Sequence, residues 1–343
     1  MNKQTLRDTA RQMLAEGKGL LAMDESNPTA DKRFAALGIP QTVEMRRAYR
    51  DLIVTAPGLA ESIGGAILYD ETIRQTALDG TPFAQALQRV GIIPGIKVDE
   101  GAKPLALHEG ELVTLGLDGL RERLAEYSKM GARFAKWRAV ITIDDANDAP
   151  SRGCIEANAH ALARYAALCQ EAGIVPIVEP EVLMDGGHTL ARCGEVTERS
   201  LHAVFEQLRT QRVDLAGMLL KPNMVVPGLA CPAQASADEV ADATIDCFRR
   251  TVPAAVAGIA FLSGGQSAAD ASARLNAMNL RHKGQLPWPV AFSFARAIQD
   301  PAMKAWSGKA ENVAAAQAKL VERARLNRLA RRGEYTAAME PAR

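Results

Sequence analysis

Two lysines of the 343-residue chain lie within otherwise apolar segments, which is a costly position for a charged side chain. Lys136 lies in FAKW and Lys221 lies in MLLKPN. Burial and a second nearby ammonium group both lower the pKa of a lysine, and the neutral amine can attack a ketone to form a Schiff base. The iminium withdraws electrons, so a carbon–carbon bond β to it can break. The pair predicts metal-free carbonyl chemistry, whereas a buried ion pair is the structural alternative for either lysine alone.

Two glutamates could supply the acid and base that this chemistry needs. Glu179 and Glu181 are two residues apart in VEPEV, so in an extended strand they point to the same face. Paired carboxylates in one pocket separate in pKa, so that one can serve as an acid while the other is ionised. Dehydration of a carbinolamine requires a proton donor, and carbon–carbon cleavage requires a base at a hydroxyl group. We therefore expect both glutamates beside the lysines.

Two further clusters resemble phosphate sites. In FLSGGQS, Ser263 and Gly264 begin a loop whose glycines let backbone N–H groups approach an anion, and we expect a helix to start after it. Arg296 follows the last apolar run and would join this loop. LSGGQ is also the signature of ABC-type ATPases, but that interpretation requires a G-x-x-x-x-G-K-[ST] loop, which the sequence lacks.

The second cluster follows the first apolar run and consists of Ser26, Thr29, Lys32 and Arg33, with Lys97 as a candidate addition. Two anion sites on opposite sides of a Schiff-base lysine predict a bisphosphorylated ketose as substrate. Taken alone, this cluster would also fit an ordinary polar helix start.

Composition narrows the other function classes. The chain has 41 Lys and Arg against 40 Asp and Glu, a net charge of +1, which argues against nucleic-acid and membrane partners. No apolar run is long enough to span a membrane, and the polar N-terminus predicts no signal peptide. The five cysteines show no C-x-x-C pair, and the five histidines show no metal-ligand spacing. We expect a cytoplasmic protein that needs neither a metal nor another cofactor.

One segment departs from this balance. Residues 319–332 carry six basic side chains and a single acid, Glu322. We interpret this segment as a solvated helix face, with a nucleic-acid contact as the alternative; no aromatic side chains for base stacking lie nearby.

Short apolar runs alternate with longer segments of helical periodicity, such as 120–130 and 158–172. The predicted strands are residues 20–23, 66–69, 95–98, 134–137, 175–178, 217–220, 259–262 and 290–292. Eight strand–helix units are the number that closes a (β/α)8 TIM barrel, here one α/β domain over residues 1–343. It would carry an N-terminal helix at 1–16, a loop at 101–119, and a C-terminal helix and tail at about 309–343. An open doubly wound sheet is the alternative, but no G-x-G-x-x-G follows the first run.

The polar candidates lie at the downstream ends of these runs. In barrel enzymes the carboxyl ends of the strands form the active-site mouth. Asp24, after the first run, joins the candidates for this reason. Such an arrangement predicts that residues far apart in the sequence converge on one site.

Seven motifs in order carry a family resemblance: LLAMDES, GIKVDEG, FAKWR, GIVPIVEPE, LLKPNMV, FLSGGQS and KAWSGK. With them the chain resembles class I, Schiff-base fructose-bisphosphate aldolases over nearly its entire length. The resemblance implies a TIM barrel, usually a homotetramer. It also implies reversible cleavage of fructose 1,6-bisphosphate to dihydroxyacetone phosphate and glyceraldehyde 3-phosphate, in glycolysis and gluconeogenesis.

The resemblance also implies a role for each candidate. Lys221 matches the Schiff-base lysine, Glu179 the acid/base, and Glu181 its support. Lys136 matches the lysine that assists carbinolamine chemistry, with Arg138 beside it, and Asp24 matches the aspartate that orients lysine and substrate. The C1-phosphate would bind Ser263, Gly264 and Arg296. The other phosphate's path would include Ser26, Thr29, Arg33, Arg46 and Lys97.

The sequence departs from the family pattern at two places. Animal enzymes read S-Y-G-R before the phosphate arginine, whereas Phe294 and Ala295 precede Arg296 here. Animal enzymes also end in a tyrosine that exchanges the enamine proton; here the last residue is Arg343, and Tyr335 is the only tyrosine of the tail. We expect another group or water to exchange that proton. The alternative functions are another Schiff-base barrel lyase or transaldolase, and a non-catalytic sugar-phosphate-binding scaffold.

Overall fold

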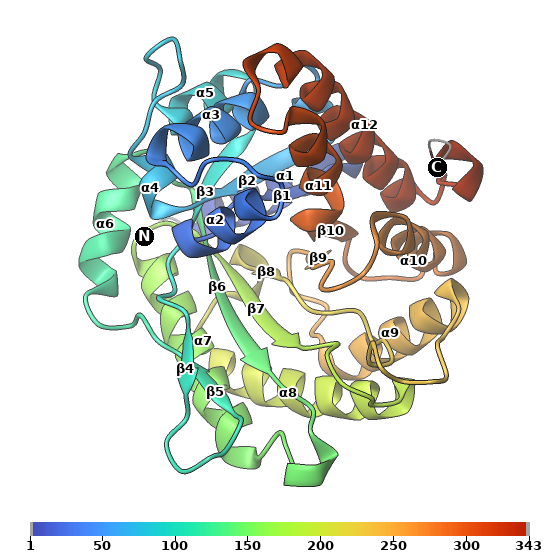
Figure 1. The fold of residues 1–343 in the computed structure, drawn as a ribbon. Coiled ribbons are helices and arrows are strands. Elements are labelled where there is room, and N and C mark those ends of the chain that lie inside the picture. Colours follow the sequence, from blue (N-terminus) through green and yellow to red (C-terminus); the bar gives the residue numbers. More distant parts are fainter. Residues whose placement is uncertain (1–2, 341–343) are drawn as a thin grey trace.

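The computed structural model describes residues 3–340, in which eight parallel strands close into a barrel (Figure 1). Around the barrel the strands follow the order β1, β10, β9, β8, β7, β6, β3 and β2. Their bounds are β1 (Gly19–Ala22), β2 (Ile63–Leu68), β3 (Ile93–Lys97), β6 (Phe134–Ile141), β7 (Val175–Val182), β8 (Leu219–Leu220), β9 (Ile259–Phe261) and β10 (Val290–Phe294). Each corresponds to one predicted run, and the predicted (β/α)8 barrel is confirmed.

Helices surround the barrel on its outside (Figure 1). They are α1 (Lys3–Met13), α2 (Asn27–Ala35), α3 (Val43–Val54), α4 (Asp70–Ile73), α5 (Phe83–Arg89), α6 (Leu120–Lys129), α7 (Arg152–Glu171), α8 (Leu190–Thr210), α9 (Ala237–Thr251), α10 (Ala268–Arg281), α11 (Arg296–Trp306) and α12 (Val313–Arg332). The helix predicted from residue 158 begins earlier, because the Ser151 side chain accepts a hydrogen bond from the Cys154 amide and caps α7. None of the described helices is long and apolar enough to cross a membrane.

Two segments differ from the expectation. β6 and β7 each continue four residues past the predicted end, because the prediction stopped before Arg138 and Glu179. The two strands stay paired there, with Arg138 opposite Glu179 and Val140 opposite Glu181. The predicted loop at 101–119 instead contains a two-stranded antiparallel sheet, β4 (Ala102–Pro104) and β5 (Leu112–Thr114).

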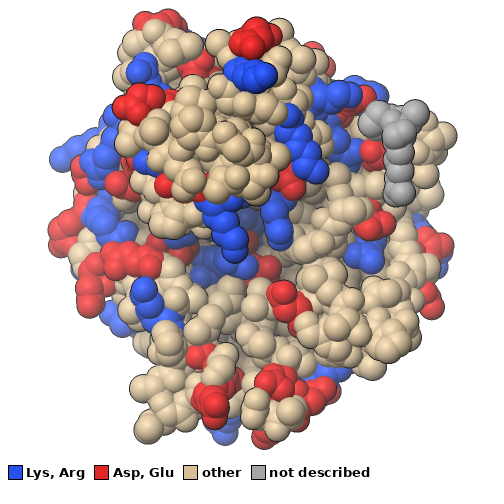
Figure 2. All heavy atoms as spheres, in the orientation of Figure 1, with Lys and Arg blue, Asp and Glu red and all other residues tan. Residues whose placement is uncertain are grey.

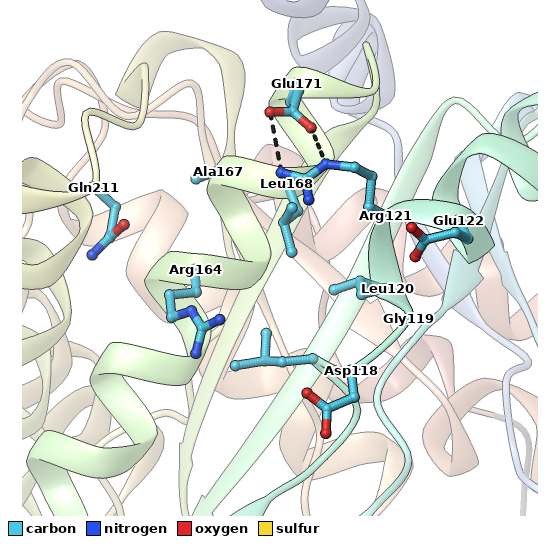
Figure 3. Close-up of a pocket in the computed structure, with 11 residues that line it drawn as sticks. Asp118, Gly119, Leu120, Arg121, Glu122, Arg164, Ala167, Leu168, Glu171 and Gln211 are labelled. Carbon is cyan, nitrogen blue, oxygen red and sulfur yellow. Dashed lines mark hydrogen bonds and ion pairs between the residues drawn. The ribbon is translucent and has the colours of Figure 1, made fainter.

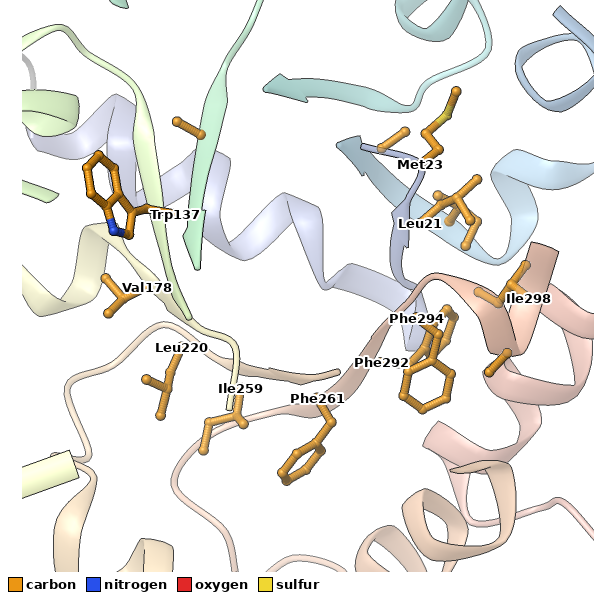
Figure 4. Packing of buried hydrophobic residues seen from close by; sticks show 14 of the residues in the cluster. Leu21, Met23, Trp137, Val178, Leu220, Ile259, Phe261, Phe292, Phe294 and Ile298 are labelled. Carbon is orange, nitrogen blue, oxygen red and sulfur yellow. The ribbon is translucent and has the colours of Figure 1, made fainter. Parts of the chain in front are cut away.

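The strands turn every second side chain into the barrel, and the interior nearer the amino ends of the strands is apolar. Phe134 of β6, Ile177 of β7 and Leu219 of β8 belong to this interior cluster, together with side chains of α1. Gly95 of β3 leaves room for the Phe134 ring, since a Cβ there would collide with it. Further apolar side chains, such as Trp137, fill the layer between strands and helices (Figure 4).

The same alternation places charged side chains above this apolar layer. Lys136, Glu179 and Lys221 each follow an interior residue by two positions, so they face the same interior nearer the carboxyl ends of the strands. The apolar layer below them excludes water from that side. The fold therefore presents ionisable groups at one end of a dry barrel.

Candidate active site

A cavity of about 590 Å³ opens at the carboxyl ends of the strands. Figure 2 shows a hollow near the centre of one face of the molecule, with Lys and Arg side chains gathered around it. The predicted residues that line the cavity are Asp24, Ser26, Thr29, Arg33, Lys97, Lys136, Arg138, Glu179, Glu181, Lys221, Ser263, Gly264 and Arg296. The structure thus brings together side chains from seven of the eight strands or the loops that follow them.

Arg46 is the one predicted residue that does not line this cavity. It lies in α3, where its guanidinium binds Glu71 and Asp31 at 2.8 and 2.9 Å. Two carboxylates neutralise its charge and fix its direction. Its position indicates that Arg46 joins α3 to its neighbours in the fold and does not reach the mouth.

Four buried side chains of alternating charge form the centre of the cavity. Lys221 Nζ lies 3.0 Å from Glu179 Oε1, and Lys136 Nζ lies 3.3 Å from Glu179 Oε2. Lys136 Nζ also lies 2.8 Å from Asp24 Oδ2. Both lysines are only 4% exposed. Glu179 therefore lies between the two lysine side chains, with one carboxylate oxygen near each Nζ.

The expected lowering of a lysine pKa is wrong for Lys136. Burial lowers its pKa, but the carboxylates of Asp24 and Glu179 outweigh burial and raise the pKa above its ordinary value. Lys136 is therefore an ammonium group at neutral pH. It can donate a proton or a hydrogen bond, but it is not a nucleophile in this state.

Asp24 shows the complementary shift. Burial raises its pKa, but the charges of Lys136 and Lys221 outweigh burial and hold the pKa at about 2, against an ordinary value of 3.8. A lowered pKa stabilises the fold above the unfolded-state value and ceases to do so as pH falls towards the folded-state value. Asp24 thus contributes about 2 kcal/mol to folding at neutral pH, which is lost from about pH 5 down to about pH 2.

We predict that Asp24→Asn flattens the acid limb of the stability profile by about 2 kcal/mol. Urea unfolding at a series of pH values measures this, and Asp185→Asn, at an exposed position in the loop after β7, serves as the control. An acid limb as steep in Asp24→Asn as in the wild type would contradict the assignment.

The predicted phosphate loop follows β9 and leads into α10, as expected. Ser267 caps the helix by accepting a hydrogen bond from the Asp270 amide at 3.1 Å. Gly264 has a φ of +52°, a conformation that favours glycine. Arg296 Nη2 donates to the Gly264 carbonyl at 2.6 Å, so the arginine that begins α11, just after β10, lies against the loop. Ala295 also lines the cavity at this side.

The second cationic cluster lines the same cavity from α2 and β3. Arg33 is held by Glu25 and by Asp300, the latter at 2.8 Å. The Lys97 ammonium lies 2.7 Å from Asp99 Oδ1. The Ser26 and Thr29 hydroxyl groups are 3.0 Å apart. Both clusters therefore bring cations and hydroxyl groups suited to an anion to the mouth.

Sequence reasoning missed two acids that position these cations. Glu25 is half-buried and binds Arg33 and Arg50. Asp99 binds Lys97 and accepts a hydrogen bond from the Arg138 amide at 3.2 Å. Both acids lie within motifs quoted for the family resemblance, LLAMDES and GIKVDEG. Their place in those motifs was the available signal.

Tyr335 does not line the cavity. Its hydroxyl donates to Glu340 at 2.8 Å and its amide donates to Asn276, so the described tail is fastened to α10. Arg343, named above as the last residue, lies outside the described residues. Within residues 3–340 the tail contributes no tyrosine hydroxyl to the mouth.

Another cavity, of about 470 Å³, lies on the outside of the barrel between α6 and α7 (Figure 3). Arg121 and Glu171 form an ion pair at 2.6 Å across it. None of the described residues that line it is a lysine, so it offers no amine for carbonyl chemistry. Residues 3–340 also contain no group of three His, Cys, Asp or Glu side chains placed to hold a metal ion.

Comparisons with known proteins identify the family of this chain. The family model described as fructose-bisphosphate aldolase class-I matches residues 5–343. A probable fructose-bisphosphate aldolase class 1 of Xanthomonas campestris is 56% identical over 336 residues, covering 98% of this chain and 99% of the relative. Fructose-bisphosphate aldolase 1 of Toxoplasma gondii is 51% identical, covering 96% and 90%.

A solved structure gives the same result. Fructose-bisphosphate aldolase of Plasmodium falciparum, crystallised with TRAP and a small-molecule inhibitor, superimposes with a TM-score of 0.96 at 46% identity, over 98% of this chain and 96% of that one. Fold, motif order and sequence identity agree over almost the whole chain. The chain belongs to the class I fructose-bisphosphate aldolase family.

Proposed function

We propose that the enzyme reversibly cleaves fructose 1,6-bisphosphate into dihydroxyacetone phosphate and glyceraldehyde 3-phosphate through a Schiff base on Lys221. The observation that carries this proposal is the Glu179 carboxylate, which contacts the ammonium groups of both Lys221 and Lys136. Lys221 must lose a proton before it can attack, and Glu179 lies at hydrogen-bond distance to accept it. Lys136 keeps its charge and stabilises the carboxylate that accepts and returns protons.

The steps then follow the positions of these groups. The Lys221 amine adds to the C2 carbonyl, and the resulting hydroxyl group leaves as water after a proton reaches it from Glu179. A base then takes the proton of the C4 hydroxyl group, and the C3–C4 bond breaks. The electron pair of that bond passes into the iminium and forms an enamine. The aldehyde leaves, C3 is protonated, and water hydrolyses the iminium to release the second product. The iminium serves as the electron sink, so the scheme needs no metal or other cofactor.

The two cationic clusters of the mouth suit a substrate that carries two phosphates. We assign the C1-phosphate to Ser263, Gly264 and Arg296, where backbone N–H groups and a guanidinium can bind it together. We assign the other phosphate to Ser26, Thr29, Arg33 and Lys97. We give Glu181 the task of holding Arg138, to which it is ion-paired, and Asp24 the task of orienting Lys136.

We also propose a homotetramer in the cytoplasm, working in glycolysis and gluconeogenesis, as the family resemblance implies. The five cysteines are buried and form no disulfide, which suits a reducing compartment.

Borohydride trapping tests the function. Reduction in the presence of fructose 1,6-bisphosphate is expected to leave a mass adduct on the peptide that contains Lys221, because borohydride reduces the iminium to a stable amine. An adduct with sugars lacking the second phosphate, at the same efficiency, would favour a transaldolase. Absence of any adduct would exclude the Schiff-base route. Activity that survives excess EDTA is expected as well, and loss of activity would point to a metal-dependent route.

A further inference from the structure

A second group of basic side chains surrounds a cavity at the end of the barrel opposite the mouth. The cavity, of about 280 Å³, lies where β10 begins and where α10 and α12 end. His282, Lys283, Arg331 and Arg332 line it, and none of its described lining residues is an Asp or Glu. The lining of this cavity therefore differs from that of the active-site mouth, where carboxylates accompany the buried lysines.

The Arg331 side chain lines this cavity without a counter-ion among the described residues. The side chain is half-buried, and among residues 3–340 it has no ion-pair partner; its Nη1 donates to the Lys18 carbonyl instead. Burial lowers the pKa of Arg331 to about 10, since no nearby acid opposes the effect. A partly desolvated cation without a counter-ion is unfavourable. Arg46 shows the usual arrangement in this protein, with two carboxylates around one buried guanidinium.

Helix α12 packs closely against the backbone at Gly17, just before β1. Gly17 has a φ of +79°, and a Cβ there would lie 3.3 Å from Arg332 Cγ and 3.9 Å from Arg328 Cγ. The aliphatic stems of two arginines therefore pack over a glycine backbone. Arg328 Nε is buried and has no hydrogen-bond partner among the described residues. Arg328, Arg331 and Arg332 belong to the basic segment that the sequence predicted to be a solvated helix face. Arg332 is exposed, but Arg328 and Arg331 are half-buried, so the prediction is wrong for these two.

Helix ends alone do not explain the cluster. Cations are favoured near a helix C-terminus, by about 0.3–1 kcal/mol when exposed. Arg332 and His282 fit this account, and each also pairs with a carboxylate outside the cavity lining, Glu334 and Asp242 respectively. Arg331 and Lys283 have no such carboxylate within the described chain. The excess charge directed at this cavity therefore lacks a structural partner.

We propose that this cavity binds a small phosphorylated metabolite, whose phosphate pairs with Arg331 and Lys283. A volume of about 280 Å³ holds a phosphate group with a small organic portion, and a macromolecule could not enter it. The buried Trp288 ring forms one wall and is fixed by a hydrogen bond from its Nε1 to the Pro253 carbonyl at 3.0 Å. The site would take an anion without any contribution from the catalytic residues.

Calorimetric titration with inorganic pyrophosphate tests the proposal. The titration uses the Arg296→Ala variant, which weakens phosphate binding at the mouth. In that background Arg331→Gln is expected to weaken pyrophosphate binding by about tenfold or more, the effect of losing a charge-assisted hydrogen bond. Arg325→Gln is the matched control, because Arg325 is an exposed arginine on the same helix that does not line the cavity.

Lys283→Gln provides a second variant, since this exposed side chain can be changed without disturbing the core, and it is expected to weaken binding in the same direction. Arg331→Gln in the otherwise wild-type chain is expected to leave aldol cleavage unchanged. Pyrophosphate binding that is insensitive to both Arg331→Gln and Lys283→Gln would overturn the proposal. Equal weakening by Arg325→Gln would overturn it too, because it would reveal only general charge attraction.

Discussion

Lys221→Met is expected to reduce aldol cleavage by about 10⁴-fold or more, the scale seen when an enzyme loses its nucleophile. Methionine is similar in length to lysine and apolar, so it can occupy the same buried position beside Leu220. The loss is expected in kcat, because both phosphate clusters remain to bind substrate. Steady-state kinetics, together with borohydride trapping of the same variant, measures the effect.

Lys136→Met is the matched control, since it removes the other buried lysine from the same cavity. Its cleavage rate is expected to fall as well, but the borohydride adduct on Lys221 should still form, although more slowly. If Lys221→Met retained an adduct and placed it on Lys136, the roles of the two lysines would be reversed. Cleavage within about tenfold of the wild type in Lys221→Met would exclude a Schiff base at this position.

The alternation of strands and helices made the barrel predictable, because each strand contains a short apolar run that ends near polar residues. The same feature led to wrong predictions for the ends of β6 and β7. Arg138 and Glu179 were interpreted as marking strand ends, yet they form a pair within the ladder between β6 and β7. At a barrel mouth, charged side chains can remain inside a strand because ion pairs such as Lys221–Glu179 and Arg138–Glu181 compensate their burial. Periodicity cannot distinguish this situation from a true strand end.

The types of the catalytic candidates were also predictable, but their protonation was not. The sequence placed two lysines near each other and suggested that both lose charge. Which effect dominates depends on Asp24 from the end of β1 and Glu179 from β7, whose distances to Lys136 are set by the closure of the barrel. Only these distances show that the attraction of two carboxylates exceeds the cost of burial for Lys136.

Arg46 illustrates the same limit. The family resemblance placed it on the path of a phosphate, and its residue type suits that role. In the structure Asp31 and Glu71 occupy its hydrogen-bonding groups. A cation that is already paired with two carboxylates gains little from a phosphate, because the existing bonds would have to break. Residue type alone could not reveal those partners, since they come from two other helices.

Glu179→Gln tests the bridge between the two lysines, and we expect kcat to fall by about 10²–10⁴-fold, the usual contribution of a general acid or base. Glutamine has nearly the same shape, so the variant should fold, and Lys136 retains Asp24 at 2.8 Å as its partner. The amide cannot accept a proton from Lys221 or return one to the carbinolamine hydroxyl group. Rapid-quench trapping with borohydride should therefore show slow formation of the Lys221 adduct, with fructose 1,6-bisphosphate binding little changed.

Glu181→Gln separates this role from a general loss of negative charge. Glu181 lies two residues further along the same strand and lines the same cavity, but its ion pair is with Arg138 and not with either lysine. Its variant is expected to slow cleavage far less than Glu179→Gln. Equal losses in the two variants would mean that the cavity requires negative charge on this strand without a specific proton acceptor. Unequal losses, with urea unfolding of both variants unchanged, would locate proton transfer at the carboxylate that contacts both ammonium groups.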